Sequence, residues 1–157
     1  MNIQTLLSRG FAFLNSSSIS SAKLDSEILL SKALNKSREY LILNSKENLK
    51  QDNIDLFNNF LERRKKNEPI AYIVKRKEFW KENFYIDQDV LIPRPDTEIL
   101  VEEVLKLFYK DSKLKILDIG TGSGCILLSI LKERRNFLGT GIDVSKKALN
   151  VARFNTK

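Results

Sequence analysis

The sequence contains no histidine, one cysteine, one methionine and one tryptophan among its 157 residues. Without histidine it lacks the usual general base, and it can form no Ser–His or Cys–His nucleophile pair. A single cysteine excludes an internal disulfide bond. One cysteine without histidine also argues against a zinc site, so we expect no bound metal. Any chemistry must therefore rely on carboxylates or on a reactive group that a cofactor supplies.

Long hydrophobic runs are missing as well. No stretch of about 18 consecutive apolar residues occurs, so we expect no membrane-spanning helix. The first 15 residues, MNIQTLLSRGFAFLN, lack both a basic start and a small-residue cleavage site, which predicts a first helix rather than a signal peptide. The composition, with 42% hydrophobic and 30% charged residues, is typical of a globular protein. We expect a cytoplasmic location.

The positive charge is not concentrated in one part of the chain. The formal net charge is +7, with 15 basic and 12 acidic residues in 1–92 and 12 basic and 8 acidic residues in 93–157. The tightest basic runs, 63–66 and 75–77, are typical of solvated helix ends or loops. This even spread argues against direct binding of nucleic acid.

Residues 1–66 show helical periodicity. Apolar side chains recur at helical spacings along three segments, which are separated by short stretches rich in Ser, Asn and Lys. The pattern predicts a small helical bundle with these stripes in its core. The stripes consist of Leu6, Leu7, Phe11, Leu14, Leu24, Ile28, Leu29, Leu34, Ile54, Leu56, Phe57, Phe60 and Leu61.

The pattern changes at Pro69. Residues 69–92 contain aromatic and β-branched residues bounded by charged turns, which predicts a β bridge with short strands at 71–74 and 83–86. Two prolines, Pro93 and Pro95, then stiffen the backbone and exclude helix before Pro95. We expect Asp96 or Thr97 to cap the helix that follows.

The last segment, 93–157, reads as a βαβα run. We predict strands at 114–119 and 137–142, and helices at 123–133 and 145–156. This order implies parallel strands with right-handed crossovers, and the fold class is α/β. The chain therefore divides into a helical domain, 1–68, a β bridge, 69–92, and an α/β domain, 93–157.

A glycine-rich loop follows the first of these strands and leads into a helix. Its residues are Gly120, Thr121, Gly122, Ser123 and Gly124. Glycines allow a sharp turn and the close approach of a ligand, and the N–H groups at a helix start attract polar or negative groups. The dinucleotide pattern GxGxxG would need glycine where this chain has Cys125, and no Gly-Lys-Ser/Thr of a Walker loop is present. Cys125 itself is expected to be a buried packing residue.

Two aspartates accompany the loop. Asp118 precedes it at the end of the first strand, where it would lie near the amino-acid portion of a ligand. Asp143 follows the next strand, 19 residues after Gly124, where a carboxylate can accept hydrogen bonds from both ribose hydroxyls of a nucleoside. The set points to a nucleoside cofactor without a pyrophosphate, and S-adenosyl-L-methionine fits it.

At these residues the sequence resembles the release factor glutamine methyltransferases, the HemK/PrmC family. The resemblance covers nearly the whole chain through DSEILLSKALNKSREYL, NEPIAYI with KEFW, LIPRPDTEILVE, ILDIGTGSGCILLSI and GIDVSKKALNVARFN. It implies an N-terminal helical domain and the first half of a Rossmann-like methyltransferase domain. It also implies methyl transfer from S-adenosyl-L-methionine to the glutamine of the Gly-Gly-Gln motif in peptide chain release factors.

The resemblance assigns roles to matching positions. Residues 120–124 correspond to the cofactor loop and Asp143 to the ribose-binding acid, while Arg94, Pro95 and Thr97 belong to a loop close to the active site. The helical domain would help to position a release factor, the implied partner.

The chain departs from the family pattern in two ways. Asn67 and Lys75 stand where glycine is usual, so we expect unusual backbone angles at both. The catalytic Asn-Pro-Pro-Tyr motif that the family implies does not occur among the 157 residues. We therefore assign no catalytic residue in this chain and expect it to be a truncated, inactive portion of such an enzyme.

Two alternatives remain open. The chain could be a release-factor-docking module or a gene remnant without activity, since the catalytic motif is missing. It could also belong to a methyltransferase that acts on another protein glutamine or on RNA, which the positive net charge favours.

Overall fold

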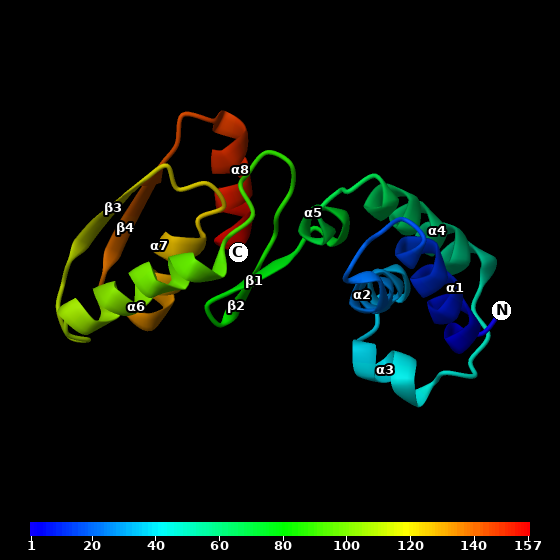
Figure 1. Ribbon diagram of the computed structural model, residues 1–157. Helices are drawn as coiled ribbons and strands as arrows, with labels where there is room; N and C mark the ends of the chain where they lie inside the picture. The colour runs from blue at the N-terminus through cyan, green and yellow to red at the C-terminus, as the bar shows by residue number, and fades with distance from the viewer. The chain divides into compact units, whose positions relative to one another are not determined.

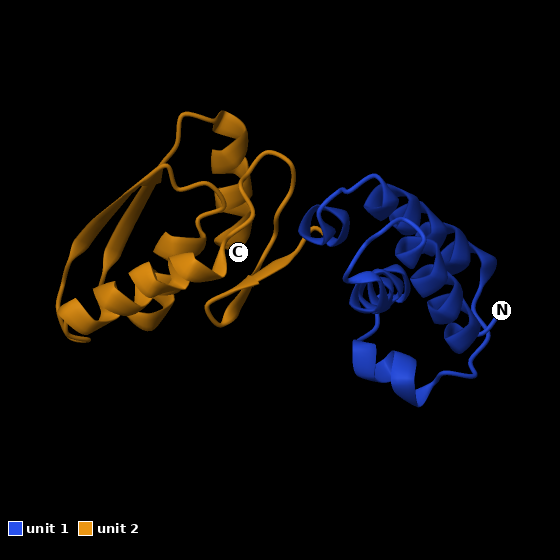
Figure 2. Ribbon diagram, viewed as in Figure 1, with its two compact units in different colours: residues 1–74 blue, residues 75–157 orange.

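The computed structural model describes residues 1–157, which form two compact units, 1–74 and 75–157 (Figure 2). The predicted α/β class is confirmed, with helices alone in the first unit and helices with two small sheets in the second. The division at residues 68 and 92 stays a prediction, because one compact unit can contain more than one functional segment.

The first unit is a helical bundle. Its helices are α1 (Ile3–Asn15), α2 (Ala22–Leu34), α3 (Arg38–Leu43), α4 (Gln51–Lys65) and α5 (Ile70–Val74) (Figure 1). Most of the predicted apolar stripes lie in or against its core, which is centred on α1, α2 and α4. Three predicted core residues are instead exposed, because they lie on the outer sides of their helices: Phe11, Leu24 and Leu56.

A glycine allows α1 to pack closely in this bundle. A Cβ atom at Gly10 would lie 2.7 Å from Cζ of Phe57 and 3.2 Å from Oγ of Ser26. Phe57 is fully buried, so its ring has no free space into which to move. Gly10 is therefore required by packing, although glycine weakens a helix relative to alanine.

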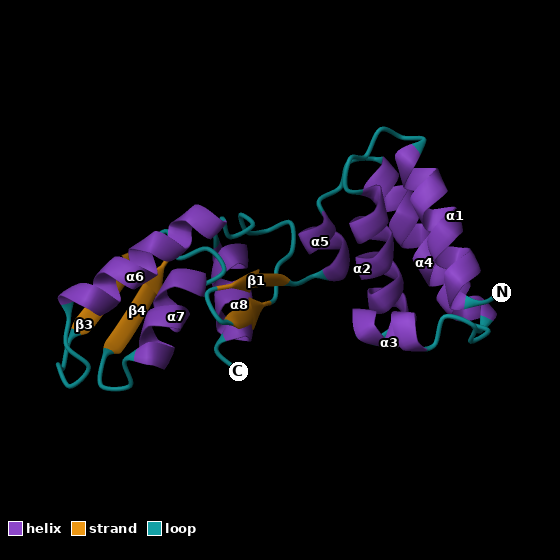
Figure 3. Ribbon diagram, turned by 60° about the horizontal axis from the view of Figure 1, so that its bottom comes forward, coloured by secondary structure: helices purple, strands orange, loops and turns teal.

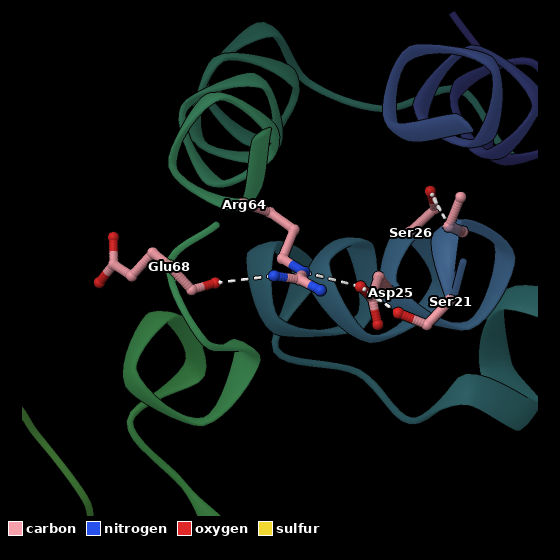
Figure 4. Close-up of polar contacts among 6 residues, drawn as sticks. Ser21, Asp25, Ser26, Arg64 and Glu68 are labelled. Atoms are coloured by element: carbon pink, nitrogen blue, oxygen red, sulfur yellow. Dashed lines mark hydrogen bonds and ion pairs between the residues drawn. The ribbon is translucent and has the colours of Figure 1, made fainter. Parts of the chain in front are cut away.

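A buried ion pair joins α2 to the end of α4. Nε of Arg64 donates to Oδ2 of Asp25 at 2.7 Å, and the hydroxyl of Ser21 donates to the same oxygen at 2.8 Å. Asp25 is only 4% exposed. Arg64 also donates through Nη1 to the carbonyl oxygen of Glu68 at 3.3 Å, as Figure 4 shows. One guanidinium thus fixes the chain where it leaves α4.

Two residues with left-handed backbone angles lie on either side of α5. Asn67 has φ 63° and Lys75 has φ 55°. The expectation of unusual angles at these two positions is therefore confirmed. Asn tolerates this region better than Lys, so the strain is greater at Lys75.

The predicted strand at 71–74 is wrong, because this segment forms the helix α5. Pro69 begins the turn, since its carbonyl oxygen accepts hydrogen bonds from the N–H groups of Tyr72 and Ile73. Ile73 and Val74 are buried against the bundle. Packing overrides the β preference of the isoleucine and valine side chains here.

The second unit begins with a β-hairpin. β1 (Lys77–Phe79) pairs antiparallel with β2 (Glu82–Phe84). β2 overlaps the strand predicted at 83–86. The turn is fixed from two helices: Trp80 donates its backbone N–H to Glu98 at 2.8 Å and its indole Nε1–H to Glu133 at 3.0 Å. The hairpin therefore belongs to the α/β unit.

The βαβα order of the second unit is confirmed. A 3₁₀ turn (Pro95–Thr97) leads into α6 (Glu98–Leu107) and is followed by β3 (Lys115–Ile119), α7 (Cys125–Glu133), β4 (Leu138–Ile142) and α8 (Lys146–Asn155). β3 and β4 pair in parallel, with Lys115 opposite Leu138 and Ile119 opposite Ile142. Figure 3 shows the two strands side by side, with α6 and α7 next to them.

The expected side-chain cap of α6 is not formed. Thr97 occupies the N-cap position but makes no capping hydrogen bond with its side chain, and Asp96 lies in the 3₁₀ turn. The turn runs directly into the helix, with Thr97 in a helical backbone conformation and its N–H donating to the carbonyl of Arg94. A capping hydroxyl needs an extended backbone at that position, which the turn does not provide.

One face of the parallel sheet is uncovered. α7 packs against the other face, where Gly139 allows the close approach of Leu127 and Leu131. The aliphatic side chains on the open face are 45–75% exposed, although parallel strands usually have both faces covered. These side chains are Leu117, Ile119, Leu138 and Ile142.

The buried ion pair makes a testable difference to stability. We expect Arg64→Ala to destabilise the first unit by about 3 kcal/mol or more, because it leaves the Asp25 carboxylate buried without its cation. Arg38→Ala serves as the control, since Arg38 pairs with Glu27 at the surface and its loss should cost less than about 1 kcal/mol. Native-state hydrogen exchange of α2 and α4 measures both values. Equal protection in the two variants would contradict the assignment.

Candidate functional site

The predicted glycine loop connects the end of β3 to the start of α7. Its three glycines all have left-handed backbone angles, with φ 79° at Gly120, 55° at Gly122 and 80° at Gly124. Residues with a Cβ atom adopt such angles only at a cost. The conformation of this loop therefore depends on glycine at each of the three positions.

The three glycines also differ in their surroundings. A Cβ atom at Gly120 would meet nothing within 4 Å, and one at Gly122 would touch only the carbonyl of Gly120, at 4.0 Å. A Cβ atom at Gly124 would lie 3.2 Å from Leu128 and 3.4 Å from Ala152. The first two glycines face open space in which a ligand can approach the backbone. The third allows α7 and α8 to pack together.

The loop is anchored to the end of β4. The backbone N–H groups of Gly120 and Thr121 both donate to the carbonyl oxygen of Ile142, at 2.9 and 3.0 Å. Gly124 then donates its N–H to the carbonyl of Thr121 at 2.8 Å, which closes the turn. These bonds bring the two strand ends together at one edge of the sheet.

The two predicted aspartates lie at this edge and contact the loop. Oδ2 of Asp118 accepts from the hydroxyl of Thr121 at 2.7 Å. Oδ2 of Asp143 accepts from the N–H of Gly122 at 2.9 Å, and its Oδ1 accepts from the N–H of Ser145 at 2.9 Å. Hydrogen bonds from the backbone N–H groups of Ser145 and Gly122 lower the pKa of Asp143 below its usual value. Asp143 is therefore ionised at neutral pH.

The residues present fit a nucleoside cofactor with a polar tail. Asp118 and Asp143 are both half-exposed, and each carboxylate keeps lone pairs beyond the bonds described. The first intrahelical bond of α7 runs from the N–H of Leu128 to the carbonyl of Gly124, so the N–H groups of its first turn have no acceptor within the helix. The edge thus offers acceptors for hydroxyl groups and donors for a carboxylate.

The residues expected in an active-site loop stand at the start of α6 in the second unit. Arg94 and Pro95 are exposed, and Thr97 is half-buried at the start of α6. No hydrogen bond or ion pair joins Arg94, Pro95 or Thr97 to the glycine loop. Their place in the site stays a prediction.

Two features of the site were missed by sequence reasoning. Asn155 donates from Nδ2 to the carbonyl of Ser123 at 2.9 Å, and it also bonds the backbone of Tyr85. Gly141 leaves room for Thr121, because a Cβ atom there would lie 2.9 Å from its hydroxyl oxygen. A glycine inside a strand pattern signals such a close approach. No local pattern identifies Asn155.

Cys125 is buried at the start of α7, as expected for a packing residue. Burial raises the pKa of its thiol, so the reactive thiolate is disfavoured. No group of three or more His, Cys, Asp or Glu side chains forms a metal-binding cluster. None of the helices is long and apolar enough to cross a bilayer.

Comparison with known proteins shows what the first unit is similar to. A family model described as "PrmC N-terminal domain" matches residues 5–74. Residues 5–74 are thus similar to this domain. The resemblance inferred from the sequence is thereby confirmed, and the PrmC match ends where the first compact unit ends.

Relatives in several bacteria extend the similarity beyond this domain. A release factor glutamine methyltransferase of Coxiella burnetii is 45% identical over 135 residues, which are 86% of this chain and 49% of that protein. One of Buchnera aphidicola is 40% identical over 155 residues, 99% of this chain and 55% of that protein. A bifunctional methyltransferase of Rickettsia felis is 39% identical over 181 residues and is covered over 34% of its length. The chain spans about half the length of the release factor methyltransferases it matches.

The different surroundings of the glycines predict different effects of alanine. Gly124→Ala should lower the unfolding temperature of the second unit more than Gly120→Ala, because it adds a tight contact with Leu128 to the same backbone strain. The fluorescence of Trp80, the only tryptophan, measures this temperature. Equal shifts in the two variants would show that packing at Gly124 is unimportant.

The lowered pKa of Asp143 predicts a specific pH dependence. Its ionised form stabilises the loop, so this contribution is complete above the ordinary pKa of the group, 3.8, and is lost as pH falls through the lower folded value. The amide resonance of Gly122 in NMR spectra should therefore stay constant down to about pH 4 and shift only below it. In Asp143→Asn this titration should disappear. A midpoint above 3.8 in the wild type would contradict the hydrogen-bonded geometry.

Proposed function

We propose that this chain contributes the cofactor site of an enzyme that methylates the glutamine of the Gly-Gly-Gln motif in peptide chain release factors, with S-adenosyl-L-methionine as methyl donor. The observation that carries this proposal is the open glycine loop held between Asp118 and Asp143 at one sheet edge. The names of the relatives support the substrate class. With translation factors as substrates, the proposed compartment is the cytoplasm.

The chain's own residues account for cofactor binding in this proposal. Asp143 accepts hydrogen bonds from the ribose hydroxyls through its remaining lone pairs. The first turn of α7 receives the carboxylate of the methionine portion, and Asp118 lies near its ammonium group. Gly120 and Gly122 leave the space that the ligand fills. When bound, the cofactor supplies a methyl group on a positively charged sulfur.

The methyl-transfer step is proposed for the longer polypeptide that the relatives represent. An amide nitrogen is a poor nucleophile because its lone pair is delocalised, so it must be held and aimed at the methyl group. The resemblance assigns this task to an Asn-Pro-Pro-Tyr motif, which residues 1–157 do not contain. We therefore propose that these residues bind the cofactor and are inactive alone, while the PrmC N-terminal domain positions the release factor.

A docking role without cofactor binding is the second candidate. It is favoured by one observation, the match of the family model to residues 5–74, which form a compact unit with their own core. In that case the first unit would bind release factors and the glycine loop would be inactive.

Binding of radiolabelled S-adenosyl-L-methionine to the purified chain separates these candidates. We expect measurable binding that Asp143→Ala weakens about tenfold or more, because the variant loses a charged acceptor and an anchor of Gly122. Asp111→Ala is the matched control, since Asp111 is an exposed aspartate in the same unit and should leave affinity unchanged.

The same preparation, mixed with a release factor, tests the substrate. We expect the factor to bind but to receive no label from residues 1–157 alone. A natively folded chain that binds release factor and no cofactor would establish the docking role instead. With RNA added to the same mixture, label appearing in the RNA and not in the factor would indicate a different acceptor.

A further inference from the structure

The side chain of Asn155 connects two segments that are distant in the sequence. At the end of α8, its Oδ1 accepts from the backbone N–H of Tyr85 at 2.8 Å, and its Nδ2 donates to the carbonyl of Tyr85 at 3.1 Å. The same Nδ2 donates to the carbonyl of Ser123 in the glycine loop at 2.9 Å. One carboxamide therefore satisfies three backbone groups.

Two neighbouring contacts bring the same elements together. The ring of Phe154, adjacent on α8, packs on the ring of Tyr85 with centroids 4.7 Å apart. Ala152, on the same helix, lies beside Gly124, with its Cβ atom 3.4 Å from the position that a Cβ atom at Gly124 would take. The end of α8 thus touches both the glycine loop and the segment after β2, and Asn155 provides the polar bonds of this junction.

We propose that Asn155 is a positioning residue that fixes the glycine loop for the cofactor by binding the carbonyl of Ser123, and this rests on the proposed cofactor role of the loop. The loop is held at Thr121 by Asp118 and at Gly122 by Asp143. Asn155 supplies the corresponding hydrogen bond at Ser123, shortly before α7 begins. All the central residues of the loop are then restrained.

The chemistry of the junction requires a carboxamide. Two carbonyl oxygens need donors and one N–H needs an acceptor, and only the asparagine amide provides both at this length. An aspartate would keep the acceptor, lose both donors and direct a negative charge at two carbonyl oxygens. Protonation of that aspartate at low pH would restore one donor.

The closing experiment compares Asn155→Asp with Asn150→Asp, the same substitution at an exposed position on the same helix. We expect Asn155→Asp to shift the amide resonances of residues 120–124 and to weaken S-adenosyl-L-methionine binding about tenfold or more. Its affinity should recover partly as pH is lowered from 7 to 5, whereas wild-type affinity stays constant. Asn150→Asp should change neither the loop resonances nor the affinity.

Loop resonances in Asn155→Asp that match those of Asn150→Asp would overturn the proposal. This readout needs no ligand, so it distinguishes failure of the positioning role from failure of the wild type to bind cofactor. Asn155→Gln, which keeps the amide on a longer stem, is the second variant if the aspartate variant does not fold. We expect it to bind with intermediate affinity, and wild-type affinity together with wild-type resonances would count against the proposal.

Discussion

The carbonyl oxygen of Ile142 accepts hydrogen bonds from two backbone N–H groups of the glycine loop, and the geometry of the second unit depends on this pair of hydrogen bonds. It brings the end of β4 against the end of β3, so Asp118 and Asp143 reach the loop from either side. The glycine φ angles follow from the same constraint, because the chain must reverse within a few residues to reach α7. Parallel pairing then places the strand ends at one edge, where α/β folds bind their ligands.

The sequence predicted this part of the fold well, since its signals are local. The strands and helices of the βαβα run lie within about two residues of their predicted bounds, because apolar runs and a glycine loop mark each change of structure. The candidate site followed from the same stretch, where two strand-end aspartates can be identified by counting. Asn67 and Lys75 were recognised as backbone irregularities because glycine was expected there.

The features that the sequence did not predict depend on contacts between residues that are distant in the sequence. Residues 71–74 carry a strand-like composition, yet burial against α2 and α4 makes them helical. Asn155 could not be identified, because its partners lie 32 and 70 residues away and an asparagine near a helix end is common. The same applies to Arg64, whose residues 63–66 read as a solvated basic run although its guanidinium is bound to a buried carboxylate.

The two units differ in how completely they bury their apolar side chains. The helical bundle closes its interior with residues of its own, and mostly with neighbours along the chain, which favours rapid folding during synthesis. The sheet of the second unit leaves four aliphatic side chains in contact with water on one face. Until another surface covers that face, the protein carries the kind of exposed apolar patch that chaperones bind and that promotes aggregation as concentration rises. The way this polypeptide is handled in a cell thus depends on two strands whose exposed surface is as apolar as a protein interior.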